Sequence, residues 1–409
     1  MSKRTFVIVG GGLAGAGAAS TLREEGFDGR VVLISSEQEQ PYHRPPLSKE
    51  YLRGDLEEAK LRVHEPALYR DQEIELRLGT TVASLEPGSR EIVLAGGERL
   101  PFDALLLATG SEPRTLDLPG AELDGVHYLR THPDSDALAA AFKGSTGVVV
   151  IGSGWIGCEV AASARMLGAD VTIVAPDRVP LEHVLGAQLG GMYGDLHRDH
   201  GVRMLLEHSI ERITGGARVE QVVLTDGTVL ACDTVVVGIG ATPRVALAQA
   251  AGLEVENGVL VDGRLQTTAA GVFAAGDIAN VPNPIFGGRR IRVEHWANAN
   301  DQGPAVARAM LGSTDVWSRV PYFFSDQYDV GMEFAGDIRD ADRVVLRGEL
   351  SSRELIAFWL QGDRLVAGMN VNVWDVSEPI QQIISTGEPV DERMLVDPGV
   401  TLESLVPAR

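Results

Sequence analysis

The first hydrophobic run of the chain, residues 6–9, is continuous, which is typical of a buried parallel strand. Gly10, Gly12 and Gly15 follow it with the spacing G-x-G-x-x-G. The alanine-rich residues 16–22 then predict a helix. Glycines in such a turn let the backbone approach a pyrophosphate, which binds the free N–H groups at the helix N-terminus. The pattern therefore predicts a dinucleotide-binding unit at the start of the chain.

A second strand and an acidic residue complete this unit. Residues 31–34 form another apolar run, and Glu37 lies 22 residues after Gly15. At that spacing a carboxylate can accept hydrogen bonds from the two hydroxyls of a ribose. This context favours a dinucleotide site over an isolated glycine-rich loop with a solvated acid nearby.

The same pattern occurs again 142 residues further along the chain. An apolar run leads to Gly152, Gly154 and Gly157, which repeat the glycine spacing. A helix is predicted over residues 158–167 and a strand over 170–174. Two such units in one chain predict two bound dinucleotides, which is typical of a flavoprotein that takes electrons from a nicotinamide.

Two more buried strands are predicted to end in glycine turns. Residues 102–108 run into Thr109 and Gly110, and residues 234–237 run into a turn that contains Gly240. Each dinucleotide unit is therefore expected to close with a strand followed by a glycine.

The last apolar strand of this part, residues 271–277, ends in Asp277, and a helix is predicted over 297–311. An acid at that end of a parallel strand lies where ligands of doubly wound folds bind. After Pro321 the pattern changes to short alternating strands and a helix, which predicts a separate α+β unit. Those strands are expected at residues 344–350, 355–360 and 364–370, and the helix at 379–386.

Composition limits the class of protein. A chain of 409 residues with 44% hydrophobic residues can bury two or three domain cores. The net charge of −21 argues against nucleic-acid binding. No apolar run reaches the roughly 18 residues that span a bilayer. The direct start in a strand and the two cysteines predict a cytoplasmic protein.

One basic cluster interrupts the acidic composition. Arg289, Arg290 and Arg292 could form a patch for a small acidic protein partner. A solvated loop is an equally good interpretation of these three residues.

Several segments resemble one family. They are P-Y-H-R-P-P-L-S-K at residues 41–49, L-A-T-G-S-E-P-R at 107–114, Y-L-R-T at 128–131, V-F-A-A-G-D at 272–277, E-H-W at 294–296 and P-Y-F-F-S-D-Q-Y at 321–328. With them the chain resembles the FAD-dependent ferredoxin reductases of the glutathione-reductase fold, a family that includes putidaredoxin, rubredoxin and dioxygenase ferredoxin reductases.

The predicted fold class is α/β, with two Rossmann-like dinucleotide-binding domains of the glutathione-reductase type and a C-terminal α+β domain. The FAD-binding domain is expected to comprise residues 1–113 and 247–320. The NAD(P)-binding domain is expected at 114–246 and the C-terminal domain at 321–409.

The resemblance implies roles for matching residues. Glu37 would hold the adenosine ribose of FAD, Val82 the adenine region and Asp277 the ribityl chain. Trp296 would lie beside the isoalloxazine, and Arg44 and Arg130 would contact the flavin or its phosphates. Together with the glycine turns, this gives the candidate cofactor-binding residues Gly10, Gly12, Ala14, Gly15, Glu37, Arg44, Pro45, Lys49, Val82, Thr109, Gly110, Arg130, Gly152, Gly154, Ile156, Gly157, Glu159, Arg178, Gly240, Asp277, Glu294 and Trp296.

Lys49 and Glu159 are the candidate catalytic residues. The resemblance implies that Lys49 lies by the flavin and that Glu159 faces the nicotinamide and pairs with Lys49. A cation near the ring stabilises the negative charge that a reduced flavin gains. Without the resemblance, a surface lysine and a glutamate at a helix start would be the simpler interpretation.

The chain departs from its relatives after residue 174. Many NADH-dependent members carry an acid there, whereas this chain has Ala175. An acid would accept the ribose hydroxyls and repel a 2′-phosphate. Arg178 could reach such a phosphate, and Asp177 could instead bind the ribose. The sequence therefore predicts that both NADH and NADPH are used.

A second departure is aromatic: Tyr322 and Phe324 stand where relatives often have tryptophans. The resemblance places the second of these positions near the exit of electrons from the flavin, although both could equally be core residues. The cysteines exclude disulfide chemistry, because Cys158 and Cys232 form no closely spaced pair.

These observations predict a flavoprotein that passes electrons from NADH or NADPH through FAD to a ferredoxin-type iron–sulfur protein. The resemblance adds a cytochrome P450 or ring-hydroxylating oxygenase as the final acceptor. The alternatives are an NAD(P)H:quinone or oxygen reductase and a redox-sensing interaction protein like apoptosis-inducing factor. No metal site is expected, and the oligomeric state is left open.

Overall fold

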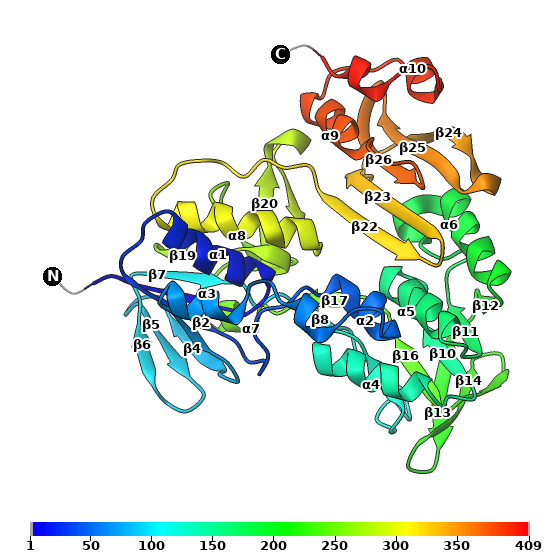
Figure 1. Cartoon of the computed structure of the whole chain (residues 1–409), viewed down its shortest axis with the longest axis horizontal. Helices are drawn as coiled ribbons and strands as arrows, with labels where there is room; N and C mark the ends of the chain where they lie inside the picture. The colour runs from blue at the N-terminus through cyan, green and yellow to red at the C-terminus, as the bar shows by residue number, and fades with distance from the viewer. Residues whose placement is uncertain (1–2, 408–409) are drawn as a thin grey trace. The chain divides into compact units, whose positions relative to one another are not determined.

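The computed structural model describes residues 3–407, which fold into helices and seven β-sheets of two to five strands (Figure 1). The chain divides into two compact units. Unit 1 takes in the chain up to His43 together with Leu61–Glu112 and Thr242–Phe323. Unit 2 takes in Arg44–Lys60, Pro113–Ala241 and the chain from Phe324 onward. The predicted division into three domains stays a prediction.

Unit 1 is built on a five-stranded parallel sheet with the order β19-β7-β1-β2-β3. All four side chains of β7 are buried, as the continuous apolar run predicts for a strand covered on both faces. The strands are β1 (Thr5–Val9), β2 (Arg30–Ile34), β3 (Ile74–Arg77), β7 (Ala104–Leu107) and β19 (Val272–Ala274).

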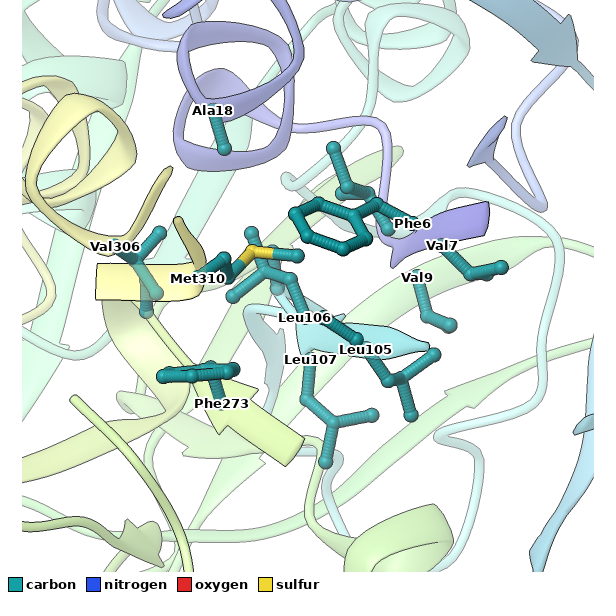
Figure 2. Close-up of a cluster of buried hydrophobic side chains, with 14 of the residues drawn as sticks. Phe6, Val7, Val9, Ala18, Leu105, Leu106, Leu107, Phe273, Val306 and Met310 are labelled. Carbon is teal, nitrogen blue, oxygen red and sulfur yellow. The ribbon is translucent and has the colours of Figure 1, made fainter. Parts of the chain in front are cut away.

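Two helices, α1 (Leu13–Glu24) and α8 (Trp296–Met310), supply side chains to the core of unit 1. Figure 2 shows Ala18 of α1 and Val306 and Met310 of α8 together with Phe6 and Leu106 of the sheet. Residues that lie some 300 positions apart in the sequence therefore share one core. Because α1 directly follows the first glycine turn, this packing fixes the helix that the turn begins.

The remaining elements of unit 1 are small. Two three-stranded sheets have the orders β4-β5-β6 and β18-β20-β21. Their strands are β4 (Val82–Glu86), β5 (Glu91–Leu94), β6 (Arg99–Pro101), β18 (Val259–Leu260), β20 (Ala279–Asn283) and β21 (Arg289–Arg292), and the short helices are α3 (Pro66–Asp71) and α7 (Ala246–Ala250). The strands β8 (Ser111–Pro113) and β17 (Ala241–Pro243), which contain the boundaries of the units along the chain, form a two-stranded sheet.

Unit 2 repeats the parallel sheet with the order β12-β11-β10-β16-β9. The middle strand again precedes a glycine turn, so β10 corresponds to β1 and α5 to α1. The strands are β9 (Val126–Tyr128), β10 (Val148–Ile151), β11 (Val171–Ala175), β12 (Arg203–Leu206) and β16 (Thr234–Val237). The helices are α2 (Glu50–Arg53), α4 (His132–Phe142), α5 (Trp155–Met166) and α6 (Glu182–Asp199).

A three-stranded antiparallel sheet extends this part of unit 2, formed by β13 (Ile210–Gly215), β14 (Val219–Leu224) and β15 (Val229–Ala231).

The C-terminal residues form a five-stranded sheet with the order β22-β23-β26-β25-β24. Its bounds are β22 (Tyr322–Gln327), β23 (Val330–Gly336), β24 (Arg343–Glu349), β25 (Glu354–Gln361) and β26 (Arg364–Val371), followed by α9 (Ser377–Thr386) and α10 (Glu392–Val396). The sequence predicted three of these strands and α9. No helix within residues 3–407 is long and apolar enough to cross a membrane.

Candidate functional site: two dinucleotide sites and a buried ion pair

The first glycine turn starts after β1 and continues into the first turn of α1, and its three glycines differ in their surroundings. A Cβ on Gly10, whose φ is +126°, would lie 2.1 Å from the backbone oxygen of Ala108. A Cβ on Gly15 would lie 2.1 Å from the backbone oxygen of Gly10. A Cβ on Gly12 would meet no atom within 4 Å. Two glycines are therefore required by packing, and Gly12 borders open space at the start of α1.

The second glycine turn, between β10 and α5, repeats this geometry. A Cβ on Gly152 would lie 2.4 Å from the backbone oxygen of Gly238, and one on Gly157 would lie 2.3 Å from that of Gly152. A Cβ on Gly154 would again meet nothing within 4 Å.

Neither α1 nor α5 has a side-chain cap at its N-terminus. The first N–H groups of each helix thus face open space beside a glycine, which is the cradle that a pyrophosphate requires. The residues present fit two dinucleotides, one in each unit.

The other candidate flavin residues of unit 1 follow the strands of its sheet. Thr109 and Gly110 follow β7, and Asp277 follows β19 in a short turn whose Gly276 N–H donates to Gln302 Oε1 at 2.8 Å. Glu37 follows β2 and accepts a hydrogen bond from the Tyr42 hydroxyl. Because carboxyl ends of parallel strands share one edge, these residues gather at the edge that carries the glycine turn.

Trp296, Glu294 and Val82 also belong to unit 1. The Trp296 indole N–H donates to His43 Nδ1 at 2.9 Å at the start of α8. Glu294 accepts a hydrogen bond from Ser111 Oγ at 3.0 Å, and Val82 begins β4. Trp296 keeps 36% of its surface exposed, so the ring is held at its N–H without being buried.

The candidate flavin residues Arg44, Pro45, Lys49 and Arg130 lie in unit 2. The Arg44 guanidinium donates to the backbone oxygen of Arg130 at 2.5 Å, so the structure brings these two candidates together.

Lys49 and Glu159 meet inside unit 2. The Lys49 Nζ lies 3.9 Å from Glu159 Oε1 and 3.9 Å from Asp326 Oδ2, and 4.7 Å from the ring centre of Phe324. Lys49 is 3% exposed and Glu159 5%. Burial raises the pKa of Glu159 above its ordinary value, and the neighbouring Lys49 ammonium opposes that rise. The predicted pair is thus a buried ion pair with a second, less buried carboxylate.

Two serines that sequence reasoning missed complete this cluster. Ser48 Oγ donates to Glu159 Oε2 at 2.5 Å, and Ser325 Oγ donates to Glu159 Oε1 at 2.7 Å. Both serines lie in segments that carry the family resemblance, residues 41–49 and 321–328. Those segments could have indicated them as site residues. Their hydroxyls give the buried carboxylate the hydrogen bonds that it needs away from water.

At the end of β11, the sequence left open whether Asp177 or Arg178 faces the nicotinamide dinucleotide. Ala175 is 1% exposed, while the Asp177 carboxylate accepts from Ser153 Oγ at 3.4 Å. Ser153 is the middle residue of the second glycine turn, so Asp177 lies against that turn. Arg178 instead donates from Nε to Glu182 Oε1 at 2.9 Å. The carboxylate, rather than the guanidinium, faces the glycine turn.

Two of the three arginines of the candidate basic cluster are engaged within unit 1. Arg290 Nη1 donates to the backbone oxygens of Val261 and Asn280, both at 2.8 Å. Arg292 donates to the backbone oxygen of Asp277 at 3.0 Å and pairs with Glu294. These side chains hold the loops together, which favours the structural interpretation of the cluster.

Both cysteines are buried and free. Burial raises the pKa of the Cys158 and Cys232 thiols, which disfavours the thiolate needed for disulfide exchange. A fold with two open glycine turns, a buried ion pair and no reactive thiol pair defines a pyridine-nucleotide flavoprotein that works without a redox disulfide. No group of three metal-ligating side chains was found in the described part of the chain.

Comparison with known proteins places the chain further. Residues 4–303 match the pyridine nucleotide-disulphide oxidoreductase family, and residues 322–406 match the reductase C-terminal family. The chain is 39% identical to the anthranilate 1,2-dioxygenase system ferredoxin–NAD(+) reductase component of Burkholderia cepacia, over 99% of this chain and 100% of that protein. It is 36% identical to rhodocoxin reductase of Rhodococcus erythropolis, over 96% of this chain and 92% of that protein.

The fold agrees with solved structures. The putidaredoxin reductase chain of a covalent complex with putidaredoxin superposes with a TM-score of 0.96, at 34% identity, over 99% of both chains. The chain therefore belongs to the FAD-dependent ferredoxin reductases of the pyridine nucleotide-disulphide oxidoreductase family. The predicted fold class, the family and the cofactors, FAD with NADH or NADPH, are confirmed.

Proposed function

We propose that this protein is the NAD(P)H-dependent reductase of a ferredoxin-type iron–sulfur protein. The observation that carries the proposal is the pair of matching, uncapped glycine turns in a chain whose cysteines are both buried. Two dinucleotides and no dithiol leave the flavin itself as the group that hands electrons on. Full-length relatives named as ferredoxin reductases support this proposal.

Bound FAD would supply the chemistry, by taking a hydride from the nicotinamide and giving up its electrons one at a time. The glycine turns, with Glu37 and Asp277 at the same sheet edge as the first of them, would hold the dinucleotides in place. Such positioning carries most of the rate of a hydride transfer, which needs no general base. Lys49 would provide a fixed positive charge for the reduced ring.

The ion pair explains why Lys49 can be positioned so firmly. A buried ammonium must have a partner, and Lys49 lies 3.9 Å from a carboxylate oxygen of both Glu159 and Asp326. These two carboxylates fix the place of the Lys49 ammonium, which would then act on the flavin as a positioned charge. We propose Lys49 and Glu159 as the catalytic residues on this ground.

The nicotinamide choice follows from Asp177. Its carboxylate lies against the second glycine turn through Ser153, where an acid accepts ribose hydroxyls and repels a 2′-phosphate. Arg178 is paired with Glu182 instead. We propose that NADH is preferred, with Asp177 in the role that an acid at position 175 has in relatives. The prediction that both cofactors are used stays a prediction.

We further propose that the ferredoxin serves a cytochrome P450 or a ring-hydroxylating dioxygenase. Relatives are named as components of dioxygenase systems or as reductases of putidaredoxin and rhodocoxin. Because both cysteines are free, as is usual in a reducing compartment, we propose that the protein works in the cytoplasm.

The test is reduction of cytochrome c through added ferredoxin. The purified protein should be yellow, with one FAD per chain that acid releases. NADH should drive cytochrome c reduction only when a candidate ferredoxin, first selected by pull-down, is present. Equal rates without any ferredoxin, or faster direct reduction of a quinone, would instead assign a quinone or oxygen reductase. Slow flavin reduction with a long-lived NAD complex would point to a redox sensor.

A further inference from the structure

The S-D-Q-Y segment at residues 325–328 joins a buried polar chain that the proposed function leaves unused. Ser325, Gln327 and His197 are 2%, 1% and 0% exposed. His197 lies on α6, while Ser325 and Gln327 lie on β22. Burying uncompensated polar groups is costly, so a complete chain of them requires that each finds its partner.

In this series of buried polar side chains, each hydrogen bond is donated in the direction of Glu159. Ionised Glu159 only accepts, so Ser325 must give it its single hydroxyl proton, over 2.7 Å. Ser325 Oγ is then left to accept from the Gln327 amide nitrogen, at 3.4 Å. The Gln327 amide oxygen in turn faces His197 Nε2 at 3.0 Å.

The direction of these hydrogen bonds determines which ring nitrogen of His197 carries the proton. Nε2 must carry the proton that Gln327 accepts, and Nδ1 is then free to accept from the Tyr328 hydroxyl, which lies 3.3 Å away. Burial lowers the pKa of His197 to about 4, so the ring is neutral and holds one N–H at physiological pH.

We propose that His197 is a positioning residue that, through Gln327 and Ser325, favours the ionised form of Glu159 beside Lys49. The consequence rests on the proposed function, because Lys49 is assigned to the flavin there. Without the Nε2–H donor the Gln327 amide can turn over, and Ser325 is no longer held with its proton toward Glu159. The buried carboxylate then takes up a proton more readily, and Lys49 loses a counter-charge.

Other titratable groups also face Glu159, and they constrain the experiment. Lys49 precedes α2, Asp326 lies on β22, Cys158 is its neighbour on α5, and Tyr193 faces it from α6. Burial raises the pKa of Cys158 and Tyr193, so both stay neutral near pH 7. Asp326 has its pKa raised by burial as well, so its carboxyl signal must be separated from that of Glu159.

Two substitutions of His197 distinguish the roles of its two ring nitrogens. The side-chain nitrogen of glutamine reaches the place of Nε2, so His197→Gln keeps the donor to Gln327. That of asparagine reaches only the place of Nδ1, so His197→Asn loses this donor. Gln327→Leu removes the same link from the other side. His200→Gln is the matched control, because the His200 ring stacks on Tyr328 but takes no part in the hydrogen bonds that link His197 to Glu159.

The measurement is the pKa of Glu159 in the holoenzyme, from the carboxyl stretch in infrared difference spectra. Glu159→Gln and Asp326→Asn assign the bands. We expect His197→Asn and Gln327→Leu to raise this pKa by about one pH unit, equivalent to a tenfold change. His197→Gln and His200→Gln should leave it within a few tenths of a unit.

Rapid mixing adds a second readout. His197→Asn should slow flavin reduction at saturating NADH, recover as the pH rises, and leave the Kd for NADH unchanged. An unshifted Glu159 pKa in His197→Asn and Gln327→Leu, or an equal shift in His197→Gln, overturns the proposal. The infrared measurement requires no ferredoxin, so the two proposals can fail separately. If only the proposed function is wrong, cytochrome c reduction will be absent while the pKa of Glu159 still shifts in the His197→Asn and Gln327→Leu variants.

Discussion

At the scale of single residues, the buried pair of Lys49 and Glu159 places two opposite charges inside unit 2, and we propose that these charges act on a bound flavin. Both side chains are almost fully buried, so the surrounding water that would weaken their field is excluded. Their contribution should therefore appear in the rate of reduction rather than in the affinity for FAD.

Lys49→Ala and Glu159→Gln should each slow flavin reduction at least about tenfold, or about 1.4 kcal/mol in the barrier. FAD occupancy should change much less, because the glycine turn and Asp277 lie in the other unit. Stopped-flow absorbance at saturating NADH measures the rate, and bound flavin per chain gives the occupancy. Lys60→Ala, at an exposed lysine of the same unit, is the control. Wild-type rates in both variants would make the pair purely structural.

Asp177 gives a second prediction at this scale. Asp177→Asn should lower the preference for NADH over NADPH about tenfold, since the repulsion of a 2′-phosphate is lost. Binding of both cofactors to the oxidised protein, measured by titration, and kcat/KM give independent values. Arg178→Ala should leave the preference unchanged, because its guanidinium is paired with Glu182. In the Asp177→Asn background, Ala175→Glu should shift kcat/KM back toward NADH by about 1–2 kcal/mol.

A wild-type protein that binds NADPH as tightly as NADH would contradict the role of Asp177. It would then support the use of both cofactors that the sequence predicts.

At the scale of elements, the two glycine turns show that glycines of one motif can be tested separately. Gly12 has φ −82° and ψ −174°, a conformation that any residue adopts, and borders open space. Gly15 instead packs against the backbone of Gly10. The first should matter for the ligand and the second for the fold.

Gly12→Val should therefore remove FAD from the protein while the melting temperature of the apoprotein stays within a few degrees. Gly15→Val should destabilise the apoprotein itself, by roughly 1–3 kcal/mol, the usual cost of forcing atoms into a packed site. Flavin content and thermal denaturation of flavin-free samples distinguish the two. Equal losses of apoprotein stability would show that Gly12 is also a packing residue.

Sequence patterns located the inner strands of both parallel sheets, because continuous apolar runs such as that of β16 leave little choice of structure. They missed the edge strands β3, β9 and β12, whose residues are only partly buried or exposed for the most part. They failed for α6, whose four glycines and non-helical Gly186 (φ +78°) erase the helical pattern. They failed also for β22, where aromatic and polar residues follow each other without alternation.

Site residues could likewise be predicted only where a local sequence pattern marks them. The glycine turns and the Lys49–Glu159 pair could be predicted from motif spacing and family resemblance. Ser325 and His197 could not, because hydrogen-bond chains depend on how α6 and β22 pack. Nor could the sequence show that the Arg178 side chain pairs with Glu182, the first residue of α6.

At the scale of the whole molecule, two histidines, one in each unit, have strongly lowered pKa values. Burial lowers the pKa of His197 in unit 2 and of His295 in unit 1 to about 4, below the 6.5 of an exposed histidine. Between these values the unfolded chain binds protons that the folded protein does not. Stability should therefore fall as the pH decreases from 6.5 toward 4.

The expected loss by pH 5 is about 2 kcal/mol for each histidine, because pH 5 lies about 1.5 units below the pKa of the unfolded state. Chemical denaturation at pH 7.5 and pH 5 measures it, and His197→Gln should lose part of the pH dependence because glutamine does not titrate. A stability that is constant from pH 7.5 to 5 in the wild-type protein would show that these rings are protonated inside the fold.

The three-part composition of unit 1 has a consequence for its biosynthesis. Within residues 3–407, β19 is the strand that pairs with β7 on the side away from β1, and α8, which ends at Met310, packs on α1. A ribosome that has made the first 240 residues has thus produced the whole parallel sheet of unit 2 but only part of the core of unit 1. We expect the nascent chain to expose the β7 edge until β19 has been made, and to acquire flavin only after α8 has emerged.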